Sequence, residues 1–153
     1  MNSLELKIPP VALVIVSGIA MWGVSLASNG FLLSEPVRMF LLGLFLLAGI
    51  SIAVAGVKSF KSAQTTVNPM KPESSSSLVS SGIFQRTRNP MYVGMALALI
   101  GWGLFLANVY SLAIVLGFVL YMTRFQIIPE ERVMAELFGI DFETYRKQVP
   151  RWL

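Results

Sequence analysis

Four long apolar segments set the strongest limit on what this chain can fold into. They cover approximately residues 9–27, 37–57, 90–107 and 110–128. Each is close to the ~20 residues that an α-helix needs to cross the hydrocarbon layer of a bilayer. The first segment ends in Ser-Leu-Ala, which resembles a signal-peptide cleavage site, but the residues before it lack a clearly basic character, so we expect it to be retained. The sequence therefore predicts an all-α integral membrane protein with about four transmembrane helices.

The composition supports this fold class and removes several kinds of chemistry. Hydrophobic residues make up 55% of the chain and charged residues 13%, whereas about a quarter of a soluble domain is usually charged. The chain contains no cysteine and no histidine. Disulfides, cysteine nucleophiles, Cys/His zinc sites and histidine general bases are therefore excluded, and we expect no metal centre.

The basic residues predict how the helices are oriented. With four spans, the N-terminus, the connection 58–89 and the C-terminal residues share one side of the membrane, and of the twelve lysines and arginines only Arg38 lies on the other. The positive-inside rule places both termini and this connection in the cytoplasm, at the inner or plasma membrane if the source is a prokaryote. This basic face should bind anionic lipid headgroups. Because topology alone explains where the basic residues lie, we expect no nucleic acid partner.

A polar and basic turn leads directly into the third apolar segment. It reads Arg-Thr-Arg-Asn-Pro-Met-Tyr-Val-Gly over residues 86–94. Asn89 is a favoured N-cap residue, and Pro90 suits the first position of a helix. The free backbone N–H groups of the first helical turn would then lie beside Arg86 and Arg88, and together they form a site for an anion.

Two acidic residues follow the fourth apolar segment. Pro129 suits the start of a helix, and Glu130 and Glu131 in its first turn suit the helix dipole. Gly139 would end this helix and Asp141 would begin another, so we expect two short amphipathic helices on the cytoplasmic membrane surface. For the two acids, simple helix-start electrostatics is an alternative to a functional role.

The third and fourth segments are joined by only a few residues, which predicts a helical hairpin. The cytoplasmic ends of a hairpin lie side by side, so the turn at 88–90 should meet Glu130. Donors for a carboxylate, an acid for an ammonium group, and the rings of Phe84 and Tyr92 for a cation would then line one pocket. This set fits a zwitterionic ligand that carries a sulfonium. The segment 78–84 is either a lid over that ligand or a plain interfacial linker.

Several short motifs together resemble one family of membrane enzymes. They are LVSSGIF at 78–84, RNPMYVG at 88–94, PEE at 129–131, LFG at 137–139 and YR at 145–146. Because these motifs occur in this order, the C-terminal half of the chain resembles the isoprenylcysteine carboxyl methyltransferase family. That family lies within a wider group that includes the phospholipid N-methyltransferases. An Arg-Asn-Pro triplet alone would be a weak signal. The joint occurrence of two groups of motifs, one within 78–94 and one within 129–146, at the ends of one hairpin is fairly specific.

The resemblance implies a methyltransferase embedded in the membrane that uses S-adenosylmethionine and releases S-adenosylhomocysteine. The cofactor would arrive from the cytosol, and a lipophilic substrate would enter from the bilayer. By motif match, the cofactor-binding residues are Leu78, Val79, Phe84, Arg88, Asn89, Pro90, Met91, Tyr92, Glu130 and Glu131. The resemblance also implies catalytic roles for Arg124, Glu130 and Tyr92, and substrate contacts for Arg124 and Gln126.

The chain departs from the family pattern at two positions. Many relatives have His-Pro where this chain has Asn89 and Pro90, and asparagine cannot titrate near neutral pH. In the prenylcysteine enzymes an arginine associated with the substrate carboxylate corresponds to Gln126. Arg124 lies two residues earlier, roughly 200° around a helix.

These residues leave the methyl acceptor open. A carboxylate needs no base, whereas an ammonium or a thiol must first lose a proton. Without histidine, the candidate bases are Glu130, Glu131 and Tyr92, which mildly favours an oxygen acid or a nucleophile that is already ionised. A carboxylate of a lipophilic substrate is the leading interpretation, and methylation of a phospholipid amine, a small molecule or a thiol is the alternative.

Two other classes of protein fit parts of the pattern. A non-catalytic membrane binding protein could keep the same fold. A small four-helix transporter of the multidrug type would need a buried acid, and the central parts of the four segments contain no Asp, Glu, Lys or Arg. We divide the chain into an N-terminal helix pair, 1–58, and a catalytic region, 59–153, within one structural domain. The oligomeric state is open.

Overall fold

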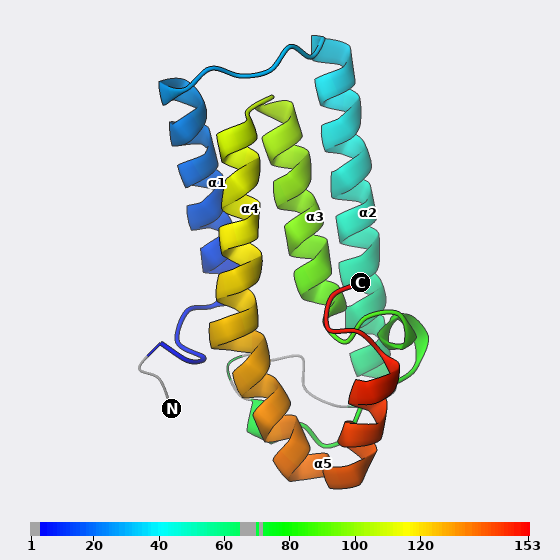
Figure 1. Ribbon diagram of the computed structural model, residues 1–153. Coiled ribbons are helices and arrows are strands. Elements are labelled where there is room, and N and C mark those ends of the chain that lie inside the picture. Colours follow the sequence, from blue (N-terminus) through cyan, green and yellow to red (C-terminus); the bar gives the residue numbers. More distant parts are fainter. Residues whose placement is uncertain (1–3, 65–69, 71) are drawn as a thin grey trace.

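The computed structural model describes residues 4–64, 70 and 72–153, and every regular element within them is helical (Figure 1). The long helices are α1 (Pro10–Ala27), α2 (Glu35–Ser62), α3 (Pro90–Phe105), α4 (Val109–Tyr121) and α5 (Ile128–Gln148). The shorter elements are the 3₁₀ turns η1 (Pro72–Ser74) and η2 (Gly82–Gln85) and the π-helical segment η3 (Met122–Ile127). The prediction of an all-α membrane protein is confirmed.

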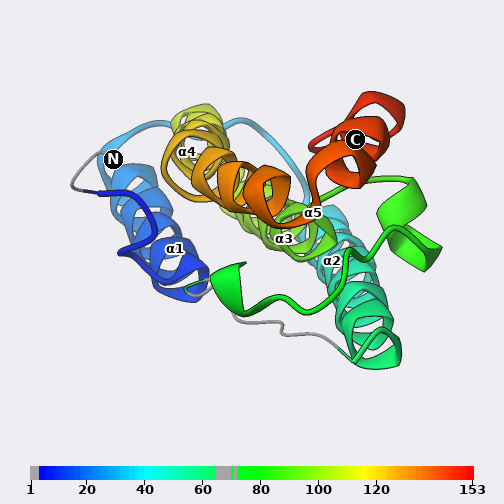
Figure 2. The same ribbon diagram turned by 90° about the horizontal axis from the view of Figure 1, so that it is seen from below.

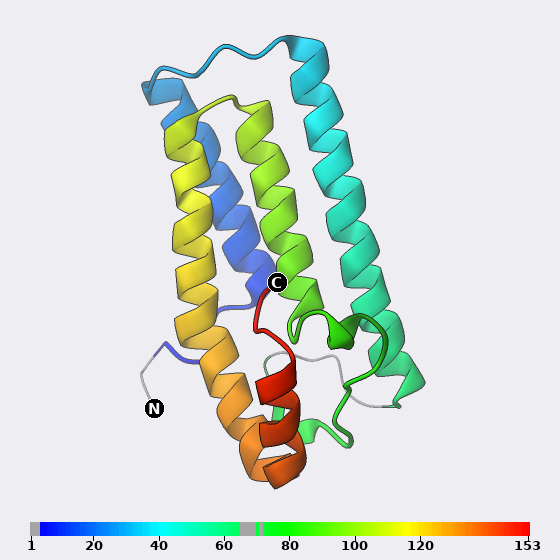
Figure 3. The same cartoon turned by 45° about the vertical axis from the view of Figure 1, so that its right-hand side comes forward.

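The helices α1, α4, α3 and α2 stand side by side as a bundle, with the α1–α2 and α3–α4 connections at the same end (Figures 1 and 3). α2 packs along α3, and α1 packs against α4 and α3. The α2–α3 contact is close because Gly49 and Gly94 face each other. A Cβ atom on Gly49 would lie 2.6 Å from the Gly94 carbonyl oxygen. These two glycines therefore have the packing role that small residues commonly have between membrane helices.

Three helical runs among the described residues are long and apolar enough to cross a membrane. They are α1, α2 and the continuous run Val109–Gln148, whose apolar part is α4 and whose charged part is α5. α3 is apolar but has 16 residues, and it ends at Phe105, short of the predicted residue 107. Seen along the bundle, α3 lies between α2 and α4 (Figure 2). The chain is thus a multi-pass membrane protein whose third apolar helix is largely covered by its neighbours.

Pro129 lies in the first turn of α5, as predicted, but the π turn η3 joins this helix to α4 without a break in the chain of helical residues. Proline has no N–H to donate to the carbonyl four residues earlier, which here is that of Phe125. This carbonyl instead accepts a hydrogen bond from the Leu6 N–H at 3.0 Å. The π turn η3, together with this contact from the N-terminal segment, lets the helix continue past the proline.

α5 has a kink at Gly139, and its second half returns towards the bundle (Figures 1 and 2). The φ of 51° and ψ of −122° at Gly139 are not helical, and glycine adopts such positive-φ conformations at little cost. The predicted break at this residue between two helical halves is confirmed. Residues 149–153 then lie beside the start of α3, at the same end of the bundle as the first described residues.

A small apolar core lies at this end of the bundle, separate from the core between the helices. Its buried residues are Val79, Phe84, Phe142, Tyr145 and Val149. The Tyr145 hydroxyl donates to the Phe84 carbonyl oxygen at 2.7 Å. This core therefore holds η2 against the second half of α5.

Candidate functional site

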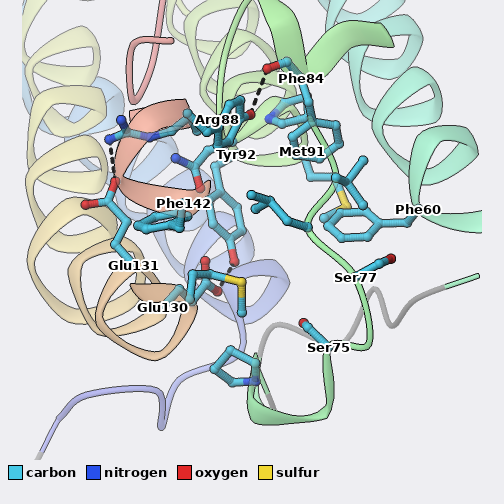
Figure 4. Close-up of a pocket in the computed structure, with 17 residues that line it drawn as sticks. Phe60, Ser75, Ser77, Phe84, Arg88, Met91, Tyr92, Glu130, Glu131 and Phe142 are labelled. Carbon is cyan, nitrogen blue, oxygen red and sulfur yellow. Dashed lines mark hydrogen bonds and ion pairs between the residues drawn. The ribbon is translucent and has the colours of Figure 1, made fainter. Parts of the chain in front are cut away.

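A pocket lies where the start of α3, the segment 72–84 and both halves of α5 meet (Figure 4). It holds about 830 Å³ of space between atoms, and this figure includes the solvent at its open mouth. All ten residues expected to bind the cofactor line it: Leu78, Val79, Phe84, Arg88, Asn89, Pro90, Met91, Tyr92, Glu130 and Glu131. The fold thus brings together two sequence blocks, 78–92 and 130–131.

Tyr92 and Glu130 meet within the pocket (Figure 4). The Tyr92 hydroxyl and the Gln126 amide nitrogen both donate to Glu130 Oε1, each at 2.6 Å. The second carboxylate oxygen, Oε2, lies outside both bonds. Burial raises the pKa of Glu130 to about 7, although the two donated bonds oppose this shift. Glu130 can therefore change its charge near neutral pH.

Arg88 and Glu131 pair with each other at one side of the pocket (Figure 4). Arg88 Nη2 donates to Glu131 Oε1 at 2.6 Å, and Arg88 Nη1 donates to the carbonyl oxygens of Arg146 and Val149. Arg151 donates to both oxygens of Glu131, at 2.9 and 2.7 Å. Burial favours a raised pKa for Glu131, but the bonds and charges of Arg151 and Arg88 outweigh it and hold this pKa below its usual range. Arg88 therefore clamps α3 to α5 besides lining the pocket.

The Asn89 side chain does not cap the start of α3, which corrects one part of the anion-site prediction. Asn89 does precede the first helical residue, Pro90, but its side chain donates to the Arg151 carbonyl oxygen at 2.9 Å. Pro90 has no N–H, and the N–H groups of Tyr92 and Val93 bond to the Asn89 carbonyl oxygen. The helix start therefore offers fewer free donors to an anion than the sequence suggests.

Seven further residues line the pocket that the sequence did not predict to bind the cofactor. They are Phe60, Pro72, Ser75, Ser77, Met134, Phe142 and Tyr145. Phe142 and Tyr145 lie three residues apart on one face of α5, a spacing that the sequence shows but that predicts only an amphipathic helix. Phe60 meets Phe84 edge to face, with ring centroids 5.2 Å apart. No sequence signal indicates this contact, because it depends on where the end of α2 meets η2.

The segment 78–84 lines the pocket through Leu78, Val79 and Phe84, and its role as a lid stays a prediction. Val79 and Phe84 are buried and belong to the small core against α5. Just before this segment, Ser77 Oγ donates to the Ala63 carbonyl oxygen at 3.0 Å, beside the end of α2. The segment is therefore tied both to α2 and to α5.

Arg124 lies outside the pocket. Its side chain is exposed, and its guanidinium carbon lies 6.0 Å from the centre of the Phe125 ring. Gln126 is buried and does not line the pocket, and it bonds to Glu130, which does. The substrate contacts of Arg124 and Gln126, and the catalytic roles of Arg124, Glu130 and Tyr92, remain predictions.

Comparison with known proteins decides the family. A family model described as phospholipid methyltransferase matches residues 37–141, which is more than half of the chain. The chain belongs to this family. An uncharacterised protein of Haemophilus influenzae is 36% identical over 63 residues, which are 41% of this chain and 100% of that protein. The protein-S-isoprenylcysteine O-methyltransferase of Schizosaccharomyces pombe is 37% identical over 76 residues, 48% of this chain and 31% of that enzyme. No solved structure matches the chain significantly.

Family membership confirms the resemblance seen in the motifs and makes this chain an integral membrane protein of the methyltransferase type. The match covers α2, α3, α4 and the first half of α5, and so includes Tyr92 and Glu130. It leaves out α1 and residues 142–153, although Phe142 and Tyr145 line the pocket. The chain spans about a third of the length of the S. pombe enzyme.

Proposed function

We propose that this member of the phospholipid methyltransferase family transfers a methyl group from S-adenosylmethionine, and that the cofactor binds in the pocket. One observation carries the proposal: ten motif residues from two distant sequence blocks line a single pocket. The family supports the reaction class.

The side chains around the cavity suit the chemical parts of this cofactor. The rings of Phe84, Tyr92 and Phe142 offer contacts to a sulfonium cation and to an adenine ring. Glu130, whose Oε2 lies outside its internal bonds, suits the ammonium group. Arg88 Nε is buried without a hydrogen-bond partner among the described residues, and it is a donor for the cofactor carboxylate.

When bound, S-adenosylmethionine would supply an activated methyl group on a good leaving group. The task of the protein is to align an acceptor with that methyl group and to exclude water. Tyr92 suits the place where the acceptor meets the methyl group, because it lines the pocket and also belongs to the buried core of the bundle, with Leu99 and Met122. A lipid headgroup in the membrane would therefore approach the cofactor at Tyr92.

We also propose that the pocket faces the cytoplasm, which supplies the cofactor. The pocket lies at the end of the bundle where the segment 72–89 and the C-terminal residues lie. With four membrane spans, eleven of the twelve lysines and arginines lie on this side of the membrane, and Arg38 lies on the opposite side. The positive-inside rule supports this orientation.

For the methyl acceptor, we propose an amine of a phospholipid headgroup in preference to a carboxylate. Arg88 is the one cationic side chain among the described residues that line the pocket, and its terminal nitrogens bond to Glu131 and to two backbone carbonyls. Arg124 lies outside. A carboxylate acceptor would therefore meet Glu130 with no free cation to offset the repulsion, whereas an amine meets no such repulsion. The S. pombe relative keeps a carboxylate as the second candidate.

Methyl transfer in reconstituted vesicles tests the acceptor. Purified protein would receive S-adenosylmethionine with a labelled methyl group, together with vesicles of phosphatidylethanolamine or with a prenylated cysteine that has a free carboxylate. We expect N-methylated phospholipid, at a rate roughly tenfold or more above that for the carboxylate compound. Labelling of the carboxylate compound alone would contradict an amine acceptor and would indicate a carboxylate instead. Arg124→Gln adds a discriminating arm, because an amine acceptor predicts little change and a carboxylate acceptor held by Arg124 predicts a loss.

A further inference from the structure

Residues 149–152 run across the turn that begins α3, and we call them the strap. The backbone N–H of Arg88 donates to the Pro150 carbonyl oxygen at 3.0 Å. The carbonyl oxygen of Arg151 accepts a bond from Asn89 Nδ2 at 2.9 Å. Arg88 and Asn89, which line the pocket, are therefore held by a segment that follows them by about sixty positions in the sequence.

Two more bonds fix the strap on either side of these contacts. Thr87 Oγ1, which is fully buried, donates to the Arg151 carbonyl oxygen at 3.3 Å. Trp152 Nε1 donates to Thr123 Oγ1 at 3.0 Å, which attaches the strap to the π turn. The strap thus joins the start of α3 to the helix that leads into α5.

The Arg151 side chain reaches the first turn of α5. Its Nε donates to Glu131 Oε1 at 2.9 Å, and its Nη2 donates to Oε2 at 2.7 Å. Arg88 bonds to Oε1 alone. Glu131 is 9% exposed and directly follows Glu130. Among the described residues, Arg151 is therefore the cation that bonds to both oxygens of Glu131.

We propose that Arg151 is a positioning residue for the cofactor site, holding Glu130 in place through Glu131 and holding Asn89 through its own carbonyl oxygen. The inference rests on the proposed cofactor site. Arg151 does not line the pocket, so it acts through these residues and not by contact with the cofactor. It also lies beyond residues 37–141, the part of the chain that the family model matches. One residue thereby joins the two walls of the pocket, through its side chain on Glu131 and its backbone carbonyl oxygen on Asn89.

Arg151 also acts on the charge of Glu130. Among the described residues, two titratable or charged groups face Glu130. Tyr92 donates a hydrogen bond to Glu130, and the negative charge of Glu131 opposes the ionisation of Glu130. Arg88 and Arg151 offset the charge of Glu131. Without Arg151, Glu131 keeps one cationic partner, so Glu130 becomes harder to ionise.

Cofactor binding by Arg151→Gln tests the proposal. Calorimetric titration of S-adenosylmethionine into the full chain in detergent would measure affinity over a range of pH. We expect Arg151→Gln to bind roughly tenfold or more weakly than wild type, and Arg151→Lys to fall between them, because lysine keeps the charge but loses the bidentate contact. The pH midpoint of binding should also move upward in Arg151→Gln. A loss of packing alone does not move this midpoint.

Arg132→Gln is the matched control. Arg132 lies in the same helix and pairs with the buried carboxylate of Glu5 at 3.3 Å, away from the residues that line the pocket. Its replacement should lower the thermal stability while the affinity and the pH midpoint of the folded protein stay at their wild-type values.

The outcomes separate this inference from the proposed function. Weaker binding by Arg151→Gln with an upward shift of the midpoint supports the positioning role. Wild-type affinity and midpoint in Arg151→Gln, even with a lower melting temperature, overturn it. If Arg151→Gln does not fold, wild-type behaviour of Arg151→Lys overturns it equally. A wild-type protein that does not bind S-adenosylmethionine overturns the proposed function, and this inference with it.

Discussion

At the scale of single residues, Glu130 is subject to opposing influences. Burial and the neighbouring charge of Glu131 disfavour its ionised form, whereas the bonds from Tyr92 and Gln126 favour it. The ammonium group of a ligand would add a further favourable term, because opposite charges attract strongly in a partly buried site. The protonation of this one carboxylate should therefore be coupled to ligand binding.

Cofactor affinity should rise as the pH is raised through about 7, the pKa to which burial raises Glu130. Below this pH the carboxylate is largely protonated and attracts an ammonium group weakly, and above it the carboxylate is ionised. Glu130→Gln still accepts a bond from Tyr92 but cannot ionise, so its affinity should be low and should not rise over this range. Binding titrations of both proteins between about pH 5.5 and 8.5 measure the effect. A rise that persists in Glu130→Gln would assign the titration to another group.

At the scale of elements, the helix that carries Glu130 departs from regular α-helix twice. The π turn lets it pass Pro129, with the freed Phe125 carbonyl bonded to Leu6. The bend at Gly139 then returns its second half to the pocket, where Tyr145 bonds to η2. Both departures place residues of one helix on opposite walls of the same cavity.

Replacing Gly139 by alanine should destabilise the protein. Its φ of 51° and ψ of −122° strain any residue with a Cβ atom, at a cost on the order of 1–3 kcal/mol. Gly117→Ala is the matched control, because Gly117 lies within α4 and an added Cβ atom would meet nothing within 4 Å. Alanine is the better helix former, so this control should be neutral or slightly stabilising. Thermal unfolding in detergent measures both, and equal melting temperatures for the two variants would contradict the strain at Gly139.

At the scale of the whole molecule, the features that the sequence predicts are those with a local cause. Apolar runs predict the helices, and the short connection between the third and fourth runs predicts the hairpin that brings Tyr92 to Glu130. The division at residue 58 stays a prediction, and α2 continues past it to Ser62.

What the sequence does not predict depends on contacts between distant residues. Arg88 is a typical anion-binding residue by type, but Glu131 and the carbonyls of Arg146 and Val149 occupy its terminal nitrogens. Asn89 is a typical N-cap by type, but the strap accepts its side-chain donor instead. No local propensity indicates these partners, since each requires that α5 first bend back towards α3.

The measurement that bears most directly on the proposed cofactor site is the binding of S-adenosylmethionine to the purified protein in detergent. We predict saturable binding by the wild type, and binding that is roughly tenfold or more weaker after Glu130→Ala, which removes the pocket carboxylate. Asn89→Ala should also weaken binding, because it removes one of the bonds that hold the start of α3 to the strap. The variants should elute as the wild type does in gel filtration, which shows that they are folded. No binding by the wild type, or equal binding by the wild type and both variants, would contradict the cofactor site.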